Sequence, residues 1–319
     1  MLDDGSGVLI GHASLGDTGV TVVCAADSEG MTCAVDVRGG GPGTRETDLL
    51  EPHNTVEKVH AVVLSGGSAF GLAAADGAMR AIAQRGRGFD VFGGAVPGGP
   101  RVPIVPAAVI FDLAVGDSEH WPDQADGAAA VAQAYRGEPA KSGNVGAGCG
   151  ATAGVFKGGF GQAQIRIGEY TVAAYVVANP VGSVIDPATG LLYGDPTKPA
   201  VDLDAFSECQ RPMPRRAQSK LNTTIGVIAT DAPLRPAQLK RLAMAGHDGI
   251  ARAVRPAHSP LDGDTLFAVS VRDAVDNVSV DKLGALSAAA ADCVQAAIVD
   301  AVVSAEPAYG VRAWREIAR

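Results

Sequence analysis

The sequence has 319 residues, of which 47% are hydrophobic and 19% charged, so it can fill the core of one large domain or two small ones. Its 41 glycines and 19 prolines follow no fixed period, which excludes a fibrous protein and indicates a globular one rich in strands and turns. The formal net charge of −9 excludes the basic face that a nucleic-acid partner requires.

The chain begins with MLDDGSGVLIGHASLGD, which lacks the basic start and the apolar core of a secretory signal. No stretch approaches 18 uninterrupted apolar residues, so we expect no membrane partner. The cysteines are odd in number and include no C-x-x-C pair, which indicates reduced thiols and argues against a zinc or redox site. They are Cys24, Cys33, Cys149, Cys209 and Cys293. These features together predict a cytoplasmic protein.

Strand patterns dominate the first 180 residues. Two β-branched runs surround a polar turn at 28–30 and predict a hairpin over residues 20–37. An apolar strand is predicted at 60–65, followed by a helix over 65–86 with Phe70, Ala73, Ala74, Met79 and Ile82 on its buried face. The glycine pair between them lacks the spacing of a phosphate loop and indicates a tight turn. Residues 105–113 predict another strand, and 163–178 predict a second hairpin.

The remainder mixes strands and helices irregularly. Residues 187–220 are rich in Pro, Asp and Arg and predict an exposed, mobile loop, which ends at the strand LNTTIGVIAT. A helix is predicted to start at Pro236, with Leu239, Leu242, Gly246, Ile250 and Val254 on one face. The segment DTLFAVSV predicts a strand, and 283–305 predict a long, nearly uncharged helix that lies buried. The pattern favours α+β layers around one core, without repeats.

The pair Asn222-Thr223 stands where the polar segment meets a strand. A threonine hydroxyl can attack the carbonyl of its own preceding peptide, and water then opens the ester and leaves the threonine at a new N-terminus. Its α-amine, with a reference pKa of about 7.7–8.0, can accept the proton of the hydroxyl near neutral pH. Taken alone, N-T-T at the start of a strand is more often only β-propensity after a polar turn.

Six ordered segments add a family resemblance to this chemistry. They are RGGGPGTRETDLLEP, VHAVVLSGGSAFGLAAADG, GNVGAGCGATAG, VVANPVG, LNTTIGVIAT and LDGDTLFAV, and they span nearly the whole chain. In this order they resemble the DmpA-type aminopeptidases and the related nylon-oligomer hydrolases, which are self-cleaving N-terminal-nucleophile hydrolases.

The resemblance implies a four-layer αββα sandwich of the kind shared with the ornithine acetyltransferases. It implies a single domain, 1–319, that cuts itself into an α-chain, 1–222, and a β-chain, 223–319, which stay associated. Members of the family are typically homo-oligomers, and none is expected to need a metal or an organic cofactor.

Asn179 and a pair of aspartates are the further site residues that the resemblance implies. Asn179, in VVANPVG, is otherwise a plain turn former, but in this family its amide is expected to stabilise the oxyanion of acyl transfer. Asp262 and Asp264 enter the strand DTLFAV, where their offset of two residues points both side chains to one face. The D-G-D pair matches the nylon-oligomer hydrolases and can orient the Thr223 amine and carry protons, although Asp262-Gly263 also fits a simple turn.

Two departures from the family pattern bear on the mechanism. Relatives have A-G-K after the glycine-rich block, whereas Val155 stands at that place here and Lys157 follows two residues later. Lys157 either reaches the same pocket or lies at the surface. Phe111 stands where several relatives have a Tyr, so Asn179 and backbone amides carry more of the oxyanion stabilisation. Cys149 is predicted to be a small buried residue and not a nucleophile.

The leading hypothesis is a self-processing N-terminal-threonine hydrolase, an aminopeptidase or amidase that cleaves small peptides or amino-acid amides through an acyl-enzyme. The first alternative is acyl transfer in the manner of the ornithine acetyltransferases, which also cut themselves before a threonine, although their motif at the cut differs from LNTTIG. The second is a protein that keeps the fold but only binds or assembles, with which Phe111 and the missing A-G-K lysine are consistent.

Overall fold

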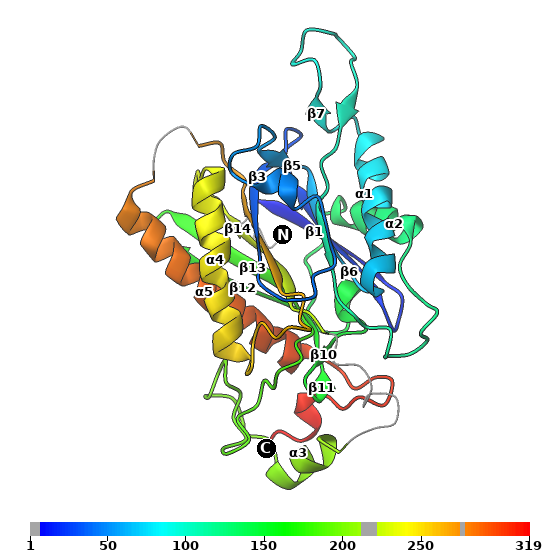
Figure 1. Cartoon of the computed structure of the whole chain (residues 1–319), viewed down its shortest axis with the longest axis vertical. Coiled ribbons are helices and arrows are strands. Elements are labelled where there is room, and N and C mark those ends of the chain that lie inside the picture. The colour runs from blue at the N-terminus through cyan, green and yellow to red at the C-terminus, as the bar shows by residue number, and fades with distance from the viewer. Residues whose placement is uncertain (1–6, 212–221, 275–277) are drawn as a thin grey trace.

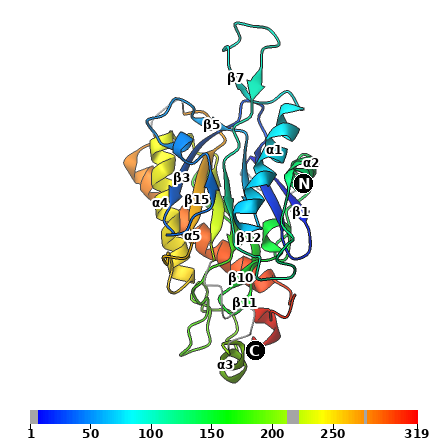
Figure 2. The same ribbon diagram turned by 45° about the vertical axis from the view of Figure 1, so that its right-hand side comes forward.

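Two β-sheets lie face to face and carry helices on their outer surfaces (Figures 1 and 2). The computed structural model describes residues 7–211, 222–274 and 278–319. Helices α1 (Ala73–Ala83) and α2 (Gln124–Ala134) cover one sheet, and helices α4 (Pro236–Ala253) and α5 (Val280–Ser304) cover the other. The layers therefore follow the order helix, sheet, sheet, helix, and the αββα prediction is confirmed.

The first sheet has five strands in the spatial order β1-β2-β6-β9-β4. Their bounds are β1 (Val8–Ser14), β2 (Gly19–Ala25), β6 (Ala61–Ser65), β9 (Ala107–Val109) and β4 (Thr44–Arg45). Strands β6 and β9 are parallel, and the other neighbours are antiparallel. The helices that cover this sheet touch through glycine: a Cβ on Gly77 of α1 would lie 1.7 Å from the carbonyl oxygen of Gln124 in α2.

The second sheet has six strands in the order β12-β13-β14-β15-β3-β5. Their bounds are β12 (Gly159–Ile167), β13 (Tyr170–Ala178), β14 (Ile225–Thr230), β15 (Thr265–Ser270), β3 (Met31–Val37) and β5 (Lys58–Val59). Strands β14 and β15 are parallel neighbours, with Ile225 opposite Thr265. Because parallel strands start at the same edge of a sheet, the residues just before β14 and β15 lie side by side.

Three apolar cores fill the spaces between the four layers. The core between the sheets includes Val23, Tyr175 and Phe267. A second core joins the first sheet to α1 and α2, and a third joins the second sheet to α4 and α5. Neighbouring residues of one strand face different cores, as Val22 and Val23 of β2 do, which explains why these strands are apolar throughout.

Helix α5 is the long apolar helix that the sequence predicts. It is long and apolar enough to cross a membrane by length and composition, a test that core helices of soluble proteins also pass. It packs against β12, β13 and α4, and 61% of its most apolar 18-residue stretch is buried inside the protein. We therefore assign it to the core.

The predicted hairpin over residues 20–37 is wrong. Both strands form, but β2 pairs with β1 and β6 in the first sheet, whereas β3 pairs with β15 and β5 in the second. The turn at 28–30 thus carries the chain from one sheet to the other. Both strands contribute buried side chains to the cores, and a buried strand finds its partners through the packing of the sheets rather than through its nearest turn. The second predicted hairpin is confirmed, since β12 and β13 pair with Ile167 opposite Tyr170.

Two further expectations need correction. Phe70 is 56% exposed in a short 3-10 turn (Ser68–Leu72) before α1, and its ring stacks on Trp121 instead of entering the core. The segment 187–211 is not a simple exposed loop, because it contains α3 (Leu203–Cys209) and buries Leu192 and Phe206. The rest of the predicted loop, 212–220, lies outside the described residues.

Two small hairpins complete the described chain. One pairs β10 (Thr152–Ala153) with β11 (Phe156–Lys157) near the site described below. The other pairs β7 (Phe89–Asp90) with β8 (Arg101–Val102) and stands away from the body at the top of Figures 1 and 2. We call residues 89–102 the arm. Five of its apolar side chains are exposed, namely Phe89, Val91, Phe92, Val96 and Val102.

Candidate active site

Thr223 lies directly before β14 and faces the peptide that precedes it. Its hydroxyl donates a hydrogen bond of 2.5 Å to the carbonyl oxygen of Asn222. The backbone N–H of Gly263 donates both to that carbonyl oxygen and to Thr223 Oγ1, each at 3.2 Å. The side chain is buried, with 4% exposure. The Thr223 hydroxyl, the carbonyl of the preceding peptide and a backbone donor to its oxygen are therefore gathered at one point.

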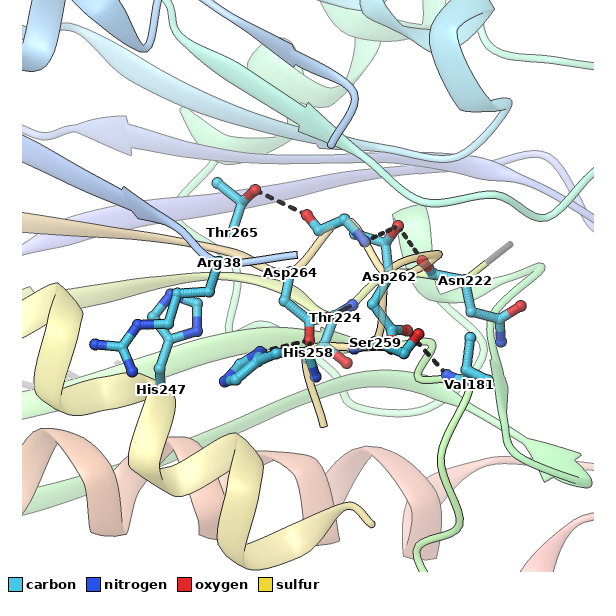
Figure 3. Close-up of polar contacts among 12 residues, drawn as sticks. Arg38, Val181, Asn222, Thr224, His247, His258, Ser259, Asp262, Asp264 and Thr265 are labelled. Carbon is cyan, nitrogen blue, oxygen red and sulfur yellow. Dashed lines mark hydrogen bonds and ion pairs between the residues drawn. The ribbon is translucent and has the colours of Figure 1, made fainter. Parts of the chain in front are cut away.

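The parallel pairing before β14 and β15 is interrupted at this point. Gly263 N–H bonds the carbonyl of Asn222, and Thr265 N–H bonds the carbonyl of Thr224, as in a regular ladder. Between these rungs, Thr224 N–H donates to Oδ1 of Asp264 at 2.7 Å, and the carbonyl of Gly263 accepts from Thr265 Oγ1 at 2.9 Å. Side chains thus replace one backbone hydrogen bond of the ladder beside Thr223. Asp264 holds the backbone N–H of Thr224, the residue that follows (Figure 3).

Asp264 is held by donors from two segments. Its Oδ2 accepts from His258 twice, from the ring Nδ1 at 2.8 Å and from the backbone N–H at 3.2 Å. Its Oδ1 takes the N–H of Thr224. With 1% exposure, this carboxylate is buried, but it accepts three hydrogen bonds, as a buried charged group must.

Asp262 lies on the other side of Gly263. The side chains of Asp262 and Asp264 point to the same side of the chain, as the sequence predicts (Figure 3). Asp262 accepts from the backbone N–H of Val181 at 3.1 Å and from that of Ser259 at 2.9 Å. Burial raises the pKa of Asp262, and the neighbouring charge of Asp264 raises it further. Where two neighbouring carboxyls have different surroundings, one commonly carries protons and the other stays ionised and holds its partners.

Asn179 is in direct contact with Thr223 through its backbone. Its carbonyl oxygen accepts the N–H of Thr223 at 2.7 Å. Its side-chain Oδ1 accepts the N–H of Thr152 at 2.8 Å, and its Nδ2 donates to the carbonyl of Phe111 at 3.1 Å. In the intact chain the amide is therefore bound to other segments, while the carbonyl orients the nitrogen that cleavage would free.

The side chain of Asn222 is also fixed. Its Nδ2 donates to the carbonyls of Pro180 at 3.0 Å and Thr152 at 3.3 Å. The residue before the predicted cut is thus tied to Thr152, which also holds Asn179, and to Pro180, which directly follows Asn179.

Lys157 is fully buried, which excludes the surface alternative. Its Nζ donates to the carbonyls of Gly148, Ala151 and Gly158 at 2.9–3.1 Å. Ala151 directly precedes Thr152, whose N–H holds Asn179. Lys157 therefore supports the glycine-rich loop behind the site.

Phe111 and Cys149 have the minor roles that the sequence indicates. Phe111 contributes its backbone carbonyl, which binds Asn179. Cys149 is buried and burial raises the pKa of its thiol, so it is not poised as a nucleophile. Among the described residues, no group of three or more His, Cys, Asp and Glu side chains is arranged to hold a metal ion.

A further buried acid, Asp112, which the sequence interpretation missed, lies beside the glycine turns of the first sheet. Asp112 has 2% exposure, and its carboxylate accepts from Thr18 Oγ1 at 2.8 Å and from Gly67 N–H at 2.6 Å. Burial raises its pKa to about 6. A Cβ on Gly150 would lie 2.6 Å from Asp112 Oδ2, so the glycine-rich loop packs directly on this carboxyl.

His258 and the N–H of Gly263 were missed as well. His258 precedes Asp262 by four residues and Asp264 by six, and this spacing is the one sequence signal that connects it to the site. Gly263 offers no side chain, so only the backbone geometry shows that its N–H faces the carbonyl of Asn222.

Comparisons with known proteins agree with this fold. A β-aminopeptidase of a Burkholderia species superposes with a TM-score of 0.71 at 25% identity, covering 96% of this chain and 88% of its own. An L-aminopeptidase D-Ala-esterase/amidase from Ochrobactrum anthropi, described as a variant of the Ntn hydrolase fold, gives a TM-score of 0.70 at 24% identity over 94% and 85% of the two chains. The fold is thus that of the Ntn-type aminopeptidases.

Sequence relatives give the family. An uncharacterized aminopeptidase of Mycobacterium leprae is 45% identical, covering 97% of this chain and 92% of its own. A 6-aminohexanoate-oligomer endohydrolase of a Kocuria species is 33% identical, over 86% of this chain and 75% of its own. The model of peptidase family S58 matches residues 1–315, so the chain belongs to that family and is a hydrolase of peptide or amide bonds. This membership favours the hydrolase over the acyl transferase and over the non-catalytic protein.

Proposed function

We propose that the chain cuts itself between Asn222 and Thr223, and that the freed Thr223 is the nucleophile that hydrolyses small peptides or amino-acid amides. The observation that carries the proposal is the contact between the Thr223 hydroxyl and the carbonyl of Asn222, with Gly263 N–H on the same carbonyl oxygen. The family membership and the aminopeptidase and oligomer-hydrolase relatives support the reaction class.

The cut begins with attack by the hydroxyl oxygen. Thr223 Oγ1 forms a bond to the carbonyl carbon of Asn222, and negative charge develops on the carbonyl oxygen, which Gly263 N–H stabilises. The bond from that carbon to the nitrogen of Thr223 breaks, and this nitrogen gains the proton that the hydroxyl loses. Water then hydrolyses the ester, which leaves a carboxylate on Asn222 and a free hydroxyl on Thr223.

The α-amine of Thr223 then becomes the base for turnover. Asn179 already binds this nitrogen through its carbonyl oxygen, so the amine is held beside its own hydroxyl. Asp264 anchors the next residue, and Asp262, with its raised pKa, is the carboxyl suited to exchange protons. The hydroxyl attacks the substrate carbonyl, the amine product leaves, and water releases the acyl group.

The primary experiment is the intact mass of freshly purified protein under denaturing conditions. Wild type is expected to yield the fragments 1–222 and 223–319, whereas Thr223→Ala stays whole and does not hydrolyse aminoacyl amides. Thr224→Ala is the matched control, because its hydroxyl is buried next to the site but has no hydrogen-bond partner among the described residues. An uncut wild-type chain after long incubation, or a cut in Thr223→Ala, would contradict the proposal.

We further propose that the cleaved protein forms a homo-oligomer in which the arm contacts a second copy. Residues 91–100 of the arm carry no charged side chain, and glycines 93, 94 and 98 have open space around them. An exposed apolar projection of this kind is typical of an interaction surface. Phe92→Ser with Val96→Ser is expected to lower the mass in light scattering, whereas Val280→Ser, at a still more exposed apolar residue elsewhere, is not.

We also propose a cytoplasmic location. All five cysteines are free thiols, four of them buried, which suits a reducing compartment. Fractionation of the native host with an antibody to the chain tests this directly, and recovery from the membrane or the medium would contradict it.

A further inference from the structure

His258 lies on the far side of Asp264 from the nucleophile and has no role in the steps above. A carboxylate can only accept hydrogen bonds, so the contact of 2.8 Å places a hydrogen on Nδ1 of His258, pointing at Asp264 Oδ2. The backbone N–H of the same residue reaches the same oxygen at 3.2 Å. One residue thus supplies both donors to this oxygen.

The backbone of His258 is set for this double contact. Its φ of +54° lies in the left-handed region, which non-glycine residues rarely adopt. This conformation turns the backbone N–H and the ring toward one acceptor. A residue is kept in such a conformation only where its surroundings determine it.

The ring is also supported from behind. The His247 ring of α4 meets it edge to face, with 4.9 Å between ring centroids. His247 has no exposed surface, and its Nε2 lies 3.1 Å from the backbone carbonyl oxygen of Asp36 in β3. The His258 ring is therefore packed between a fixed ring and the carboxylate (Figure 3).

The other oxygen of Asp264 leads to the nucleophile. Oδ1 accepts the N–H of Thr224 at 2.7 Å, in the place where the backbone ladder lacks a rung. A carboxylate held at one oxygen cannot rotate away from the partner of the other. The position of Thr224, and hence of the adjoining Thr223, depends on how firmly Oδ2 is held.

We propose that His258 is a positioning residue for Thr223, acting through Asp264. His258 holds Oδ2 of Asp264 in place through two hydrogen bonds. Oδ1 then stays bound to the N–H of Thr224, and the Asn222–Thr224 segment remains in contact with the N–H of Gly263. This inference deepens the proposed function and rests on Thr223 being the nucleophile. Displacement of a reacting group by about 1 Å can cost roughly 10²-fold in rate, so a loosened clamp has a large effect on the cut.

The test compares His258→Gly with His258→Asn. Both residues tolerate a positive φ, but only Asn has a side-chain N–H that can reach Asp264. Self-cleavage is followed by gel after cell-free synthesis of the whole chain. We expect the Gly variant to cut roughly 10²-fold more slowly than wild type and the Asn variant to recover most of that rate. His53→Asn, at an exposed histidine, is the control.

A second readout does not depend on cleavage. In the uncut Thr223→Ala chain, hydrogen exchange of the Thr224 amide is expected to rise at least about tenfold on His258→Gly and much less on His258→Asn. Thermal unfolding of each variant identifies a loss of the whole fold. A folded Gly variant with unchanged Thr224 exchange, or equal rates for Gly and Asn, would overturn the clamp. A wild type that never cuts would instead refute the proposed function, while the exchange result still decides the role of His258.

Discussion

Two buried acid clusters, one on each sheet, differ in what their carboxylates touch. Asp112, on the first sheet, has a pKa raised to about 6, but its partners are Thr18 and a backbone N–H of the glycine turn. Asp262 and Asp264, on the second sheet, flank the Gly263 N–H that bonds Thr223. A strongly raised pKa at Asp112 is therefore not evidence of catalysis, because among the described residues the contacts of Thr223 and Thr224 lead to the second cluster.

The two clusters are joined by the glycine-rich loop. Gly150 packs on Asp112, and Thr152, two residues later, holds the side chain of Asn179. Lys157 binds the loop from behind through the carbonyls of Gly148 and Ala151. The contacts of Asp112 and Lys157 thus support the glycine-rich loop, whereas those of Asp262 and Asp264 lie around Thr223. Substitutions in each group test this division of roles.

Lys157→Met is expected to have the largest effect on stability. Three backbone carbonyls would lose a buried, charged donor, and a hydrogen bond to a charged group contributes about 1.5–3 kcal/mol. We expect the free energy of unfolding to fall by roughly 3 kcal/mol or more in denaturant titration of the uncut Thr223→Ala chain. Lys141→Met, at an exposed lysine, is the control. Equal stability of the two variants would show that the loop does not need this support.

Asp264→Asn is expected to slow self-cleavage by roughly 10²-fold, because an amide cannot accept from His258 and Thr224 at both ends. The rate is measured by the appearance of the fragment that starts at Thr223. Asp273→Asn, in an exposed ion pair, is the control. If Asp112→Asn slowed the cut as much as Asp264→Asn, the assignment of the two clusters would be reversed.

Asp112→Asn is expected to change stability in a manner that depends on pH. The folded chain raises the pKa of this acid from 3.8 to about 6, so the folded state binds the proton more tightly than the unfolded one. Stability is therefore lost as pH rises from about 4 to 6, by up to roughly 2–3 kcal/mol. Asn carries no charge, so the stability of the variant relative to wild type should rise between about pH 4 and 6 and stay level at higher pH. Thermal melts across this range measure the gain, and a constant difference would contradict it.

The smallest effect is a displacement of the pH profile through Asp262. Burial raises its pKa, and a group that must accept a proton works only when deprotonated. The Thr223 amine sets the first fall in rate with decreasing pH, and protonation of Asp262 should add a second fall at a pH above the ordinary Asp pKa of about 3.9. Asp262→Asn should lose this second fall and keep the first. A second fall that persists in the variant would assign it to another group.

The sequence was most informative where periodicity and buried apolar runs agree. Helices α4 and α5 and the pair β12-β13 follow from spacing and turn residues, because each is set by local contacts. The interpretation of β2 and β3 as a hairpin failed because a polar turn can lead either back along the same sheet or across to the next. Only the packing of the two sheets distinguishes these outcomes.

The same division holds in the site. The sequence by itself determined the family, the reaction class and the chemical groups of Thr223, Asn179, Asp262 and Asp264, because these are identities of side chains in ordered motifs. The tertiary structure decided that the N–H of Gly263 faces the carbonyl of Asn222, that Lys157 is buried and that His258 binds Asp264. These contacts join segments distant in the chain or depend on backbone direction, and neither is fixed by local residue patterns.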